Sequence, residues 1–238
     1  MRNLVQAELL KLRTVRSLLW ITLGMLVLVG ISVISVVASS DAIQDASRDR
    51  SIARISAIAV VFALLQGIIV MGAEGTHGTI TQTFLVAPVR ERVLAAKALV
   101  AAVVGIGLAV AAEVLTVVVA APGLSLSVHD ARYVLIGVLI AGAAAGALGV
   151  GLGALFHRQG PAIITAFLWL LIGESVLAIG LRDGVRFLPA HVFAATVAGT
   201  VHGSASDLLG AWPGALGAVL YAVAFLIVGS ARLSRRDV

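Results

Sequence analysis

Six long stretches almost free of charged residues restrict the possible folds of this chain more than any other feature. They lie at about residues 18–38, 55–73, 98–121, 133–156, 161–181 and 211–231. Each is close to the roughly 20 apolar residues that a helix needs to cross the hydrocarbon core of a bilayer. Only 12% of the residues are charged, whereas a soluble domain carries about a quarter. The sequence therefore predicts an all-α integral membrane protein with six transmembrane helices in a single domain, residues 1–238.

The basic residues between these stretches predict the orientation. Eleven of the 17 lysines and arginines fall in the terminal segments and in the loops after the second and fourth stretches. Because lysine and arginine accumulate in cytoplasmic loops, both termini are predicted to lie in the cytoplasm. The setting expected for such a chain is the bacterial plasma membrane. The formal charge of +5 is then a consequence of topology, which argues against a nucleic-acid partner.

Residues 2–17 are predicted to form an amphipathic helix along the inner membrane surface. One face of this helix carries the apolar residues Leu4, Val5, Leu9, Leu12 and Val15, a pattern typical of helices that lie in the membrane interface. A plain basic tail before the first span is the alternative.

The loop between the second and third stretches carries the most specific motif of the chain. Thr79 and Gln82 form a capping box, Gly78 precedes it, and Pro88 ends the short helix that it predicts. The apolar residues of this helix would be poorly placed in water: Ile80, Phe84 and Leu85. From these residues alone, insertion into lipid and docking on a partner are both open.

The chain resembles the type-2 ATP-binding-cassette (ABC) exporter permeases in three places. These are residues 8–20, the loop from Glu74 to Lys97, and the ending 235–238. The resemblance implies an N-terminal elbow helix at 2–17 and an outer re-entrant region at about 182–210. It also implies that residues 79–88 are a coupling helix seated on a separate ATPase subunit. The coupling residues it indicates are Glu74, Gly78, Thr79, Ile80, Gln82, Phe84, Leu85, Pro88 and Arg92.

The partners that the resemblance implies are two ABC ATPase subunits and a second permease, either a copy of this chain or a paralogue. Neither lysine of the chain, Lys11 or Lys97, follows a glycine, and the phosphate-binding loop of an ATPase requires a Gly-Lys pair. The chain is therefore predicted to be no enzyme and to hold no cofactor. ATP and Mg²⁺ are expected in the partner, which would drive export by alternating access.

Two acidic residues are predicted to lie inside the membrane. Glu113 and Glu174 fall about 24 and 20 Å from the cytoplasmic ends of their helices, at 1.5 Å per residue. Such acids usually face a cavity or a partner. They could line a translocation path for a cationic or amphipathic substrate, or form hydrogen bonds with groups such as Arg182, His191 or His202.

Two other functions remain open from the sequence. Glu113 and Glu174 could carry protons in a secondary transporter, or the chain could be a membrane anchor or sensor that transports nothing. A metal site is not predicted, because the five histidines are scattered over different loops.

The fourth stretch carries a stripe of glycines at steps of four, three and four residues: Gly142, Gly146, Gly149 and Gly153. Small residues at this spacing let another helix approach closely. The stripe predicts either packing inside the chain or a seam between two copies.

Overall fold

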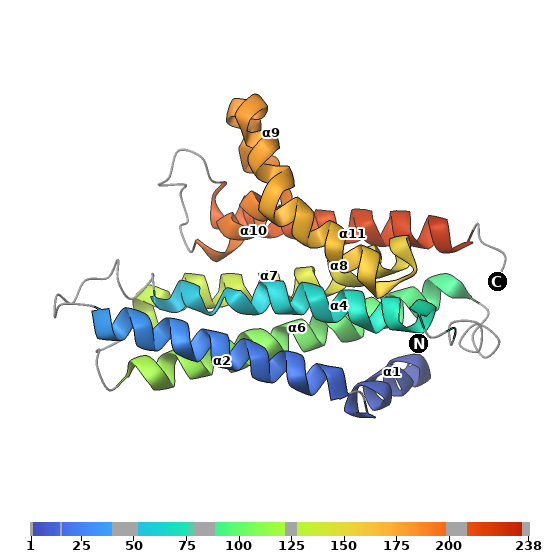
Figure 1. Cartoon of the computed structure of the whole chain (residues 1–238), viewed down its shortest axis with the longest axis horizontal. Coiled ribbons are helices and arrows are strands. Elements are labelled where there is room, and N and C mark those ends of the chain that lie inside the picture. The colour runs from blue at the N-terminus through green and yellow to red at the C-terminus, as the bar shows by residue number, and fades with distance from the viewer. Residues whose placement is uncertain are drawn as a thin grey trace.

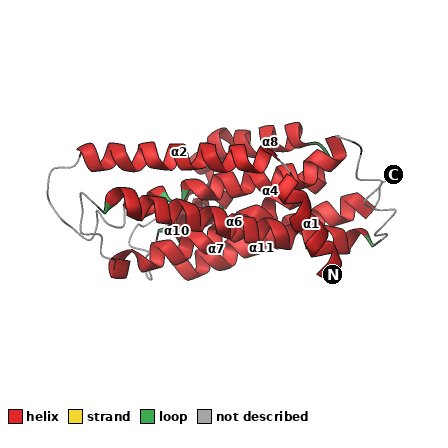
Figure 2. Cartoon of the chain, turned by 90° about the horizontal axis from the view of Figure 1, so that it is seen from below, coloured by secondary structure: helices red, strands yellow, loops and turns green. Residues whose placement is uncertain are grey.

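The computed structural model describes residues 2–14, 16–39, 52–76, 78, 89–121, 128–198 and 209–234. Over these residues the chain is helical, with no strand, as Figure 2 shows. The elements in chain order are α1 (Arg2–Thr14), α2 (Arg16–Ser39), α4 (Ile58–Thr76), α6 (Arg90–Ala120), α7 (Val128–Phe156), α8 (Gln159–Leu168), the π-helix η1 (Trp169–Gly173), α9 (Glu174–Leu181), the 3₁₀ helix η2 (Arg182–Phe187), α10 (Pro189–Val197) and α11 (Ala211–Ser234).

Six helical segments of the described chain are long and apolar enough to cross a bilayer, which confirms the predicted fold class. They are Arg16–Ala38, Ile52–Thr76, Arg90–Ala120, Arg132–Phe156, Gln159–Leu181 and Ala211–Ser234.

The centre of the bundle is α7, which packs against α4, α6, α10 and α11. Its small residues allow this, because neighbouring backbones approach it closely where glycine or alanine stands. Buried alanines and valines such as Ala141, Ala145 and Val150 fill the remaining contacts. Helix α2 lies on the outside, against α4 and α6, with one buried row of Met25, Val29 and Val33.

The two ends of the bundle differ. Helix α1 lies at one end, here named the α1 end, and α10 lies at the other, here named the α10 end (Figures 1 and 2). The α7–α8 turn and the last residues of α11 also lie at the α1 end. There Arg90 at the start of α6 donates a hydrogen bond to the carbonyl of Leu233 (2.6 Å).

The fifth span leaves the bundle. In Figure 1 the segment from α8 to α9 rises away from the long axis of the other helices. Its helix is interrupted at 169–173 by the π-helix η1, and π-turns within α-helices are frequent at functional sites. Apolar periodicity gives no direction for a helix, so the sequence did not indicate this divergence.

The third span begins earlier than the sequence indicates. Its helix starts at Arg90, whereas the apolar stretch was expected from residue 98 because Lys97 is charged. Lys97 is nevertheless completely buried, since two carboxylates neutralise it.

Candidate functional site

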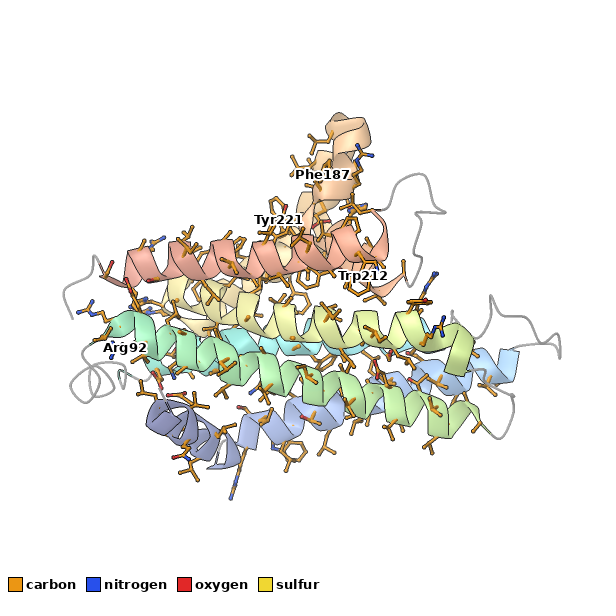
Figure 3. All side chains as sticks on the ribbon, turned by 180° about the vertical axis from the view of Figure 1, so that it is seen from behind. Arg92, Phe187, Trp212 and Tyr221 are labelled. Atoms are coloured by element: carbon orange, nitrogen blue, oxygen red, sulfur yellow. The ribbon has the colours of Figure 1, made fainter. Side chains whose placement is uncertain are left out.

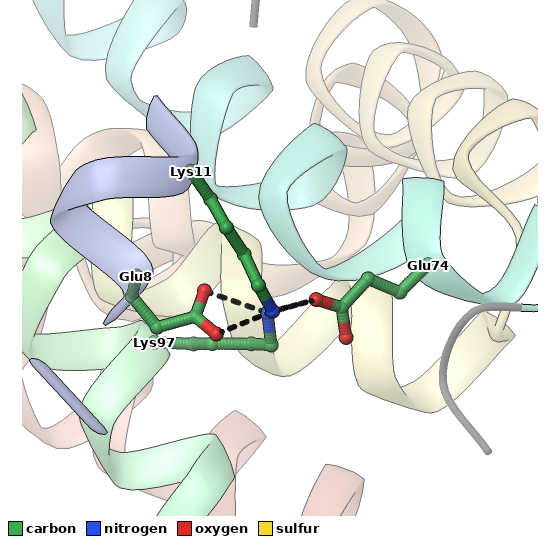
Figure 4. Close-up of polar contacts among 4 residues, drawn as sticks. All are labelled: Glu8, Lys11, Glu74 and Lys97. Carbon is green, nitrogen blue, oxygen red and sulfur yellow. Dashed lines mark hydrogen bonds and ion pairs between the residues drawn. The ribbon is translucent and has the colours of Figure 1, made fainter. Parts of the chain in front are cut away.

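Four charged side chains from three helices form a cluster at the α1 end (Figure 4). Lys97 of α6 contacts Glu8 of α1 at 2.8 Å and Glu74 of α4 at 2.7 Å. Lys11 of α1 contacts the same two carboxylates at 3.0 and 2.9 Å. These are the two lysines of the chain. We name these four residues the four-charge cluster; it is neutral as a whole, with two positive and two negative groups.

The place of each residue on its helix brings these four side chains together. Glu8 and Lys11 are three residues apart and therefore share one face of α1. Glu74 stands two residues before the end of α4. Lys97 lies seven residues into α6, about 10 Å along its axis from Arg90. Each buried charge thus has a partner, the condition for tolerating ions away from water.

Burial differs within the four-charge cluster. The side chain of Lys97 is fully buried, whereas that of Lys11 is 48% exposed. Partial burial disfavours charge on Lys11, but the hydrogen bonds and attraction from Glu74 and Glu8 outweigh it and raise the pKa of Lys11 above its usual value. Lys11 therefore stays protonated at neutral pH.

The four-charge cluster lies at the base of the loop that the sequence analysis singles out. Glu74 precedes this loop and is joined to α1 and α6. Of the other predicted coupling residues, Gly78 is exposed with a φ of 69°, a backbone conformation that favours glycine. Arg92 is exposed at the α1 end (Figure 3). The remaining predicted residues lie outside the described part of the chain: Thr79, Ile80, Gln82, Phe84, Leu85 and Pro88.

The end of α4 also meets the turn between α7 and α8. A Cβ atom on Gly75 would overlap the carbonyl of His157, and one on Gly72 would lie 2.8 Å from the backbone of Gln159. Thr76 accepts a hydrogen bond from the backbone of Gln159 (3.4 Å). The base of the loop is therefore in contact with α1, α6 and the α7–α8 turn together.

A cavity of about 840 Å³ lies between the fifth span and the bundle. This volume is within the range of small-molecule sites, about 300–1,000 Å³. Its walls come from the second span, α7, α8, η1, α10 and α11, and most lining side chains are aliphatic or phenylalanine. Four lining residues carry polar side-chain atoms: Arg54, Thr165, Trp169 and Tyr221.

Glu174 does not line this cavity, but it fixes two residues that do. Its carboxylate accepts hydrogen bonds from the Trp169 indole (3.0 Å) and the Ala190 backbone (2.6 Å). The other oxygen lies 3.1 Å from Nδ1 of His191. Glu174 is buried, and Trp169 and Ala190 belong to the cavity wall. The carboxylate thus joins the π-helix to the start of α10.

Glu113 lies away from the cavity. It is half-buried on α6, and one carboxylate oxygen, Oε1, has no hydrogen-bond partner among the described residues. Neither Glu113 nor Glu174 is among the described residues that line the cavity. That the two acids line a translocation path stays a prediction.

The four glycines of the predicted stripe on α7 meet neighbours within the chain. Gly142 and Gly146 lie against the α6 backbone at Gly105 and Ala101, whereas Gly149 and Gly153 lie against α4. The stripe divides between two partners because α4 and α6 cross α7 at different levels. In this chain the glycine stripe packs α7 into its own bundle.

Sequence reasoning missed the pairing of Glu8 with Lys97, the cavity lining by Arg54, and the interaction of Trp169 with Glu174. A signal existed for the first. The chain has two lysines, and each stands in a polar segment that also carries glutamate: Glu8 with Lys11, and Glu74 and Glu91 with Lys97. No sequence pattern indicated that Arg54 lines the cavity or that Trp169 interacts with Glu174, because both depend on the direction of the fifth span.

Comparison with known proteins identifies the class. No curated protein matches the chain. The model of a family described as ABC-2 family transporter protein matches residues 4–180, which takes in α1, the four-charge cluster, the glycine stripe and most of the fifth span. The chain therefore belongs to the ABC-2 transporter family, and it is a multi-pass membrane permease of an ABC transporter.

Proposed function

We propose that this chain is the permease subunit of an exporter, driven by separate ATP-hydrolysing subunits that bind at the α1 end. In this proposal the α1 end faces the cytoplasm, and the permease pairs with a second copy or a paralogue. Two ATPase subunits supply the energy, and access to the cavity alternates between the two sides of the membrane. Family membership supports association with an ATPase subunit.

The four-charge cluster is the observation that carries this proposal. A loop that transmits force must be attached firmly to the helices that move. Glu74 and Lys97 stand on the two helices that flank residues 77–89, and their carboxylate and ammonium groups are 2.7 Å apart. Glu8 adds α1, the predicted elbow helix, to the same contact. A displacement of the loop would therefore reach α1, α4 and α6 together.

The apolar cavity supports the transport step. Its wall at α8 and η1 belongs to the one span that diverges from the bundle (Figure 1). The π-helix leaves this span with a weaker pattern of backbone hydrogen bonds than a regular α-helix, which favours bending at that point. Movement of the fifth span would open or close the cavity while the packed core of α4, α6 and α7 stays unchanged.

The energy source tests the proposal. Inside-out vesicles that contain the chain and its ATPase partner should take up a fluorescent amphiphile when ATP is added, also in the presence of a protonophore. Deletion of the ATPase partner should stop uptake. Uptake that follows the proton gradient and ignores ATP would contradict the proposal.

That contrary result would favour the second candidate, a proton-coupled transporter. One observation favours a proton-coupled transporter: Oε1 of Glu113 has no hydrogen-bond partner among the described residues. Acidic residues within membrane spans can act in proton relays. Glu113→Gln should then abolish uptake, whereas in an ATP-driven exporter it should leave uptake within about twofold of the wild type.

A further inference from the structure

We propose that the cavity beside the fifth span binds an anionic amphiphile, a molecule with a long apolar chain and a negatively charged head. This inference deepens the proposed function by naming its substrate class. It reverses the charge expected from the sequence, where Glu113 and Glu174 suggested a cationic substrate.

The length and lining of the cavity match an apolar chain. Its wall follows the second span from Arg54 to Leu64 and α7 from Ala145 to Phe156. At 1.5 Å per residue these two stretches are each about 15 Å long. Each corresponds to about half of the roughly 30 Å of hydrocarbon in a bilayer. Side chains such as Leu148, Leu152 and Phe193 give the wall an aliphatic and aromatic surface without charge.

The charge of the cavity comes from Arg54 at the α10 end. One Arg54 nitrogen donates a hydrogen bond to the Ala198 carbonyl (2.8 Å), which holds the guanidinium at the end of α10. A guanidinium carries five N–H donors, so this bond leaves others to bind a phosphate, sulfonate or carboxylate head. Among the described lining residues Arg54 is the one charged side chain.

The nearest buried acid does not cancel this preference. Glu174 stands behind the cavity wall, and its carboxylate accepts hydrogen bonds from Trp169 and Ala190 and lies against His191. Its negative charge is therefore engaged by protein groups and is not presented to a ligand. A cationic head would find Arg54 at one end and no acid in the described lining, and like-charge contact disfavours binding.

Tryptophan fluorescence can test this inference on the purified permease. Trp169 lines the cavity and is 39% exposed, whereas Trp20 and Trp212 are 69% and 65% exposed on other helices. A Trp20→Phe, Trp212→Phe protein reports on the cavity through Trp169. A Trp20→Phe, Trp169→Phe protein reports through Trp212 on the surrounding lipid. Both proteins are placed in nanodiscs of zwitterionic lipid and titrated with brominated amphiphiles. These amphiphiles share one apolar chain, and the bromine atoms on that chain quench nearby indoles.

Three probes share this chain and differ in the head: phosphate, alcohol or trimethylammonium. The phosphate probe should quench Trp169 saturably at a concentration about tenfold below that of the alcohol, as expected for a charge-assisted hydrogen bond. The trimethylammonium probe should bind more weakly than the alcohol. Quenching of Trp212 should not saturate and should not depend on the head group of the probe. Arg54→Gln should abolish the preference for phosphate, and Arg54→Lys should keep part of it.

A second arm separates a free amphiphile from a bilayer lipid. Brominated phosphatidylglycerol replaces part of the nanodisc lipid, and quenching of Trp169 well above that of the more exposed Trp212, before any probe is added, would identify a membrane phospholipid as the occupant. Equal affinity for the phosphate and alcohol probes, or preference for trimethylammonium, would overturn the inference. Because the assay contains neither ATP nor the ATPase, its result is independent of the proposed energy source.

Discussion

At the scale of single residues, Lys97 shows how a charge can be kept inside a largely apolar bundle. An isolated ammonium buried away from water costs several kcal/mol, and the cost is offset only where partners with good geometry surround it. Lys97 meets that condition with Glu8 at 2.8 Å and Glu74 at 2.7 Å. Removal of the lysine would leave two buried carboxylates with Lys11 as their shared partner.

Lys97→Met should therefore destabilise the protein by about 3–5 kcal/mol, the usual effect of breaking a buried ion pair. Thermal unfolding in detergent measures this effect. Lys11→Met is the matched control, because its half-exposed side chain contributes at most about 1 kcal/mol. If the two variants lose stability equally, the buried Lys97 contributes no more to stability than the half-exposed Lys11, and the prediction is wrong.

The second residue of interest is Glu174, which organises the cavity wall without facing the cavity. Glu174→Gln removes the carboxylate charge to which Trp169 and Ala190 donate and puts an NH₂ donor where an oxygen now lies 3.1 Å from Nδ1 of His191, so these hydrogen bonds weaken. We expect a loss of about 1–3 kcal/mol and a shifted Trp169 emission. Glu113→Gln, which removes no hydrogen bond to a described residue, should leave both unchanged. A change in substrate preference without a change in stability would assign Glu174 to the translocation path instead.

At the scale of elements, close contacts of α7 hold the bundle together. The sequence predicted that Gly142, Gly146, Gly149 and Gly153 of α7 share a face, because 3.6-residue periodicity is readable from spacing. It could not name the partners, since these depend on how α4 and α6 cross α7. The same limit applies to the fifth span: its apolar length predicted a membrane helix, but periodicity does not give its divergence, or the contacts of Glu174 with Trp169 and with Ala190 and His191 of α10.

Gly149→Ala tests the α4–α7 contact. A Cβ atom at this position would overlap the Leu64 carbonyl and lie 2.9 Å from the Ile68 nitrogen, so one backbone must move. Overpacking of this kind costs about 1–3 kcal/mol, measurable as a lowered unfolding temperature. Gly107→Ala is the control, since open space surrounds its Cβ position on α6, and it should be neutral or slightly stabilising. A neutral Gly149→Ala would mean that α7 does not pack this closely.

At the scale of the whole molecule, the two ends have different roles in this account. The α1 end combines the four-charge cluster, the base of the predicted coupling loop and the α7–α8 turn. The α10 end combines Arg54, Glu174 and the start of the cavity wall, which continues along α7 to Phe156. Charge asymmetry along the sequence predicted the orientation, because it depends on counts of lysine and arginine in loops. The cavity could not be predicted, because its residues come from five separate segments.

The orientation can be measured by labelling, since the chain contains no cysteine. Single cysteines at Ser47 and Ser204 should react with an impermeant reagent added to intact cells, because the proposed topology puts them in outer loops. A cysteine at Ser234, at the α1 end, should react only after the membrane is opened. Labelling of Ser234→Cys in intact cells would reverse the proposed topology.

Attachment of an ATPase through residues 79–88 is the central claim, and ATP turnover of the purified complex tests it most directly. Phe84→Asp places a charge on the predicted docking surface, where one buried aromatic commonly contributes about 2 kcal/mol or more to binding. Phe187→Asp is the matched control, because Phe187 is 55% exposed on the segment beyond the fifth span (Figure 3). Phe84→Asp should insert normally but lose the ATPase subunit and substrate-stimulated hydrolysis, whereas Phe187→Asp should keep both. Normal capture and normal stimulated hydrolysis in Phe84→Asp would contradict the central claim.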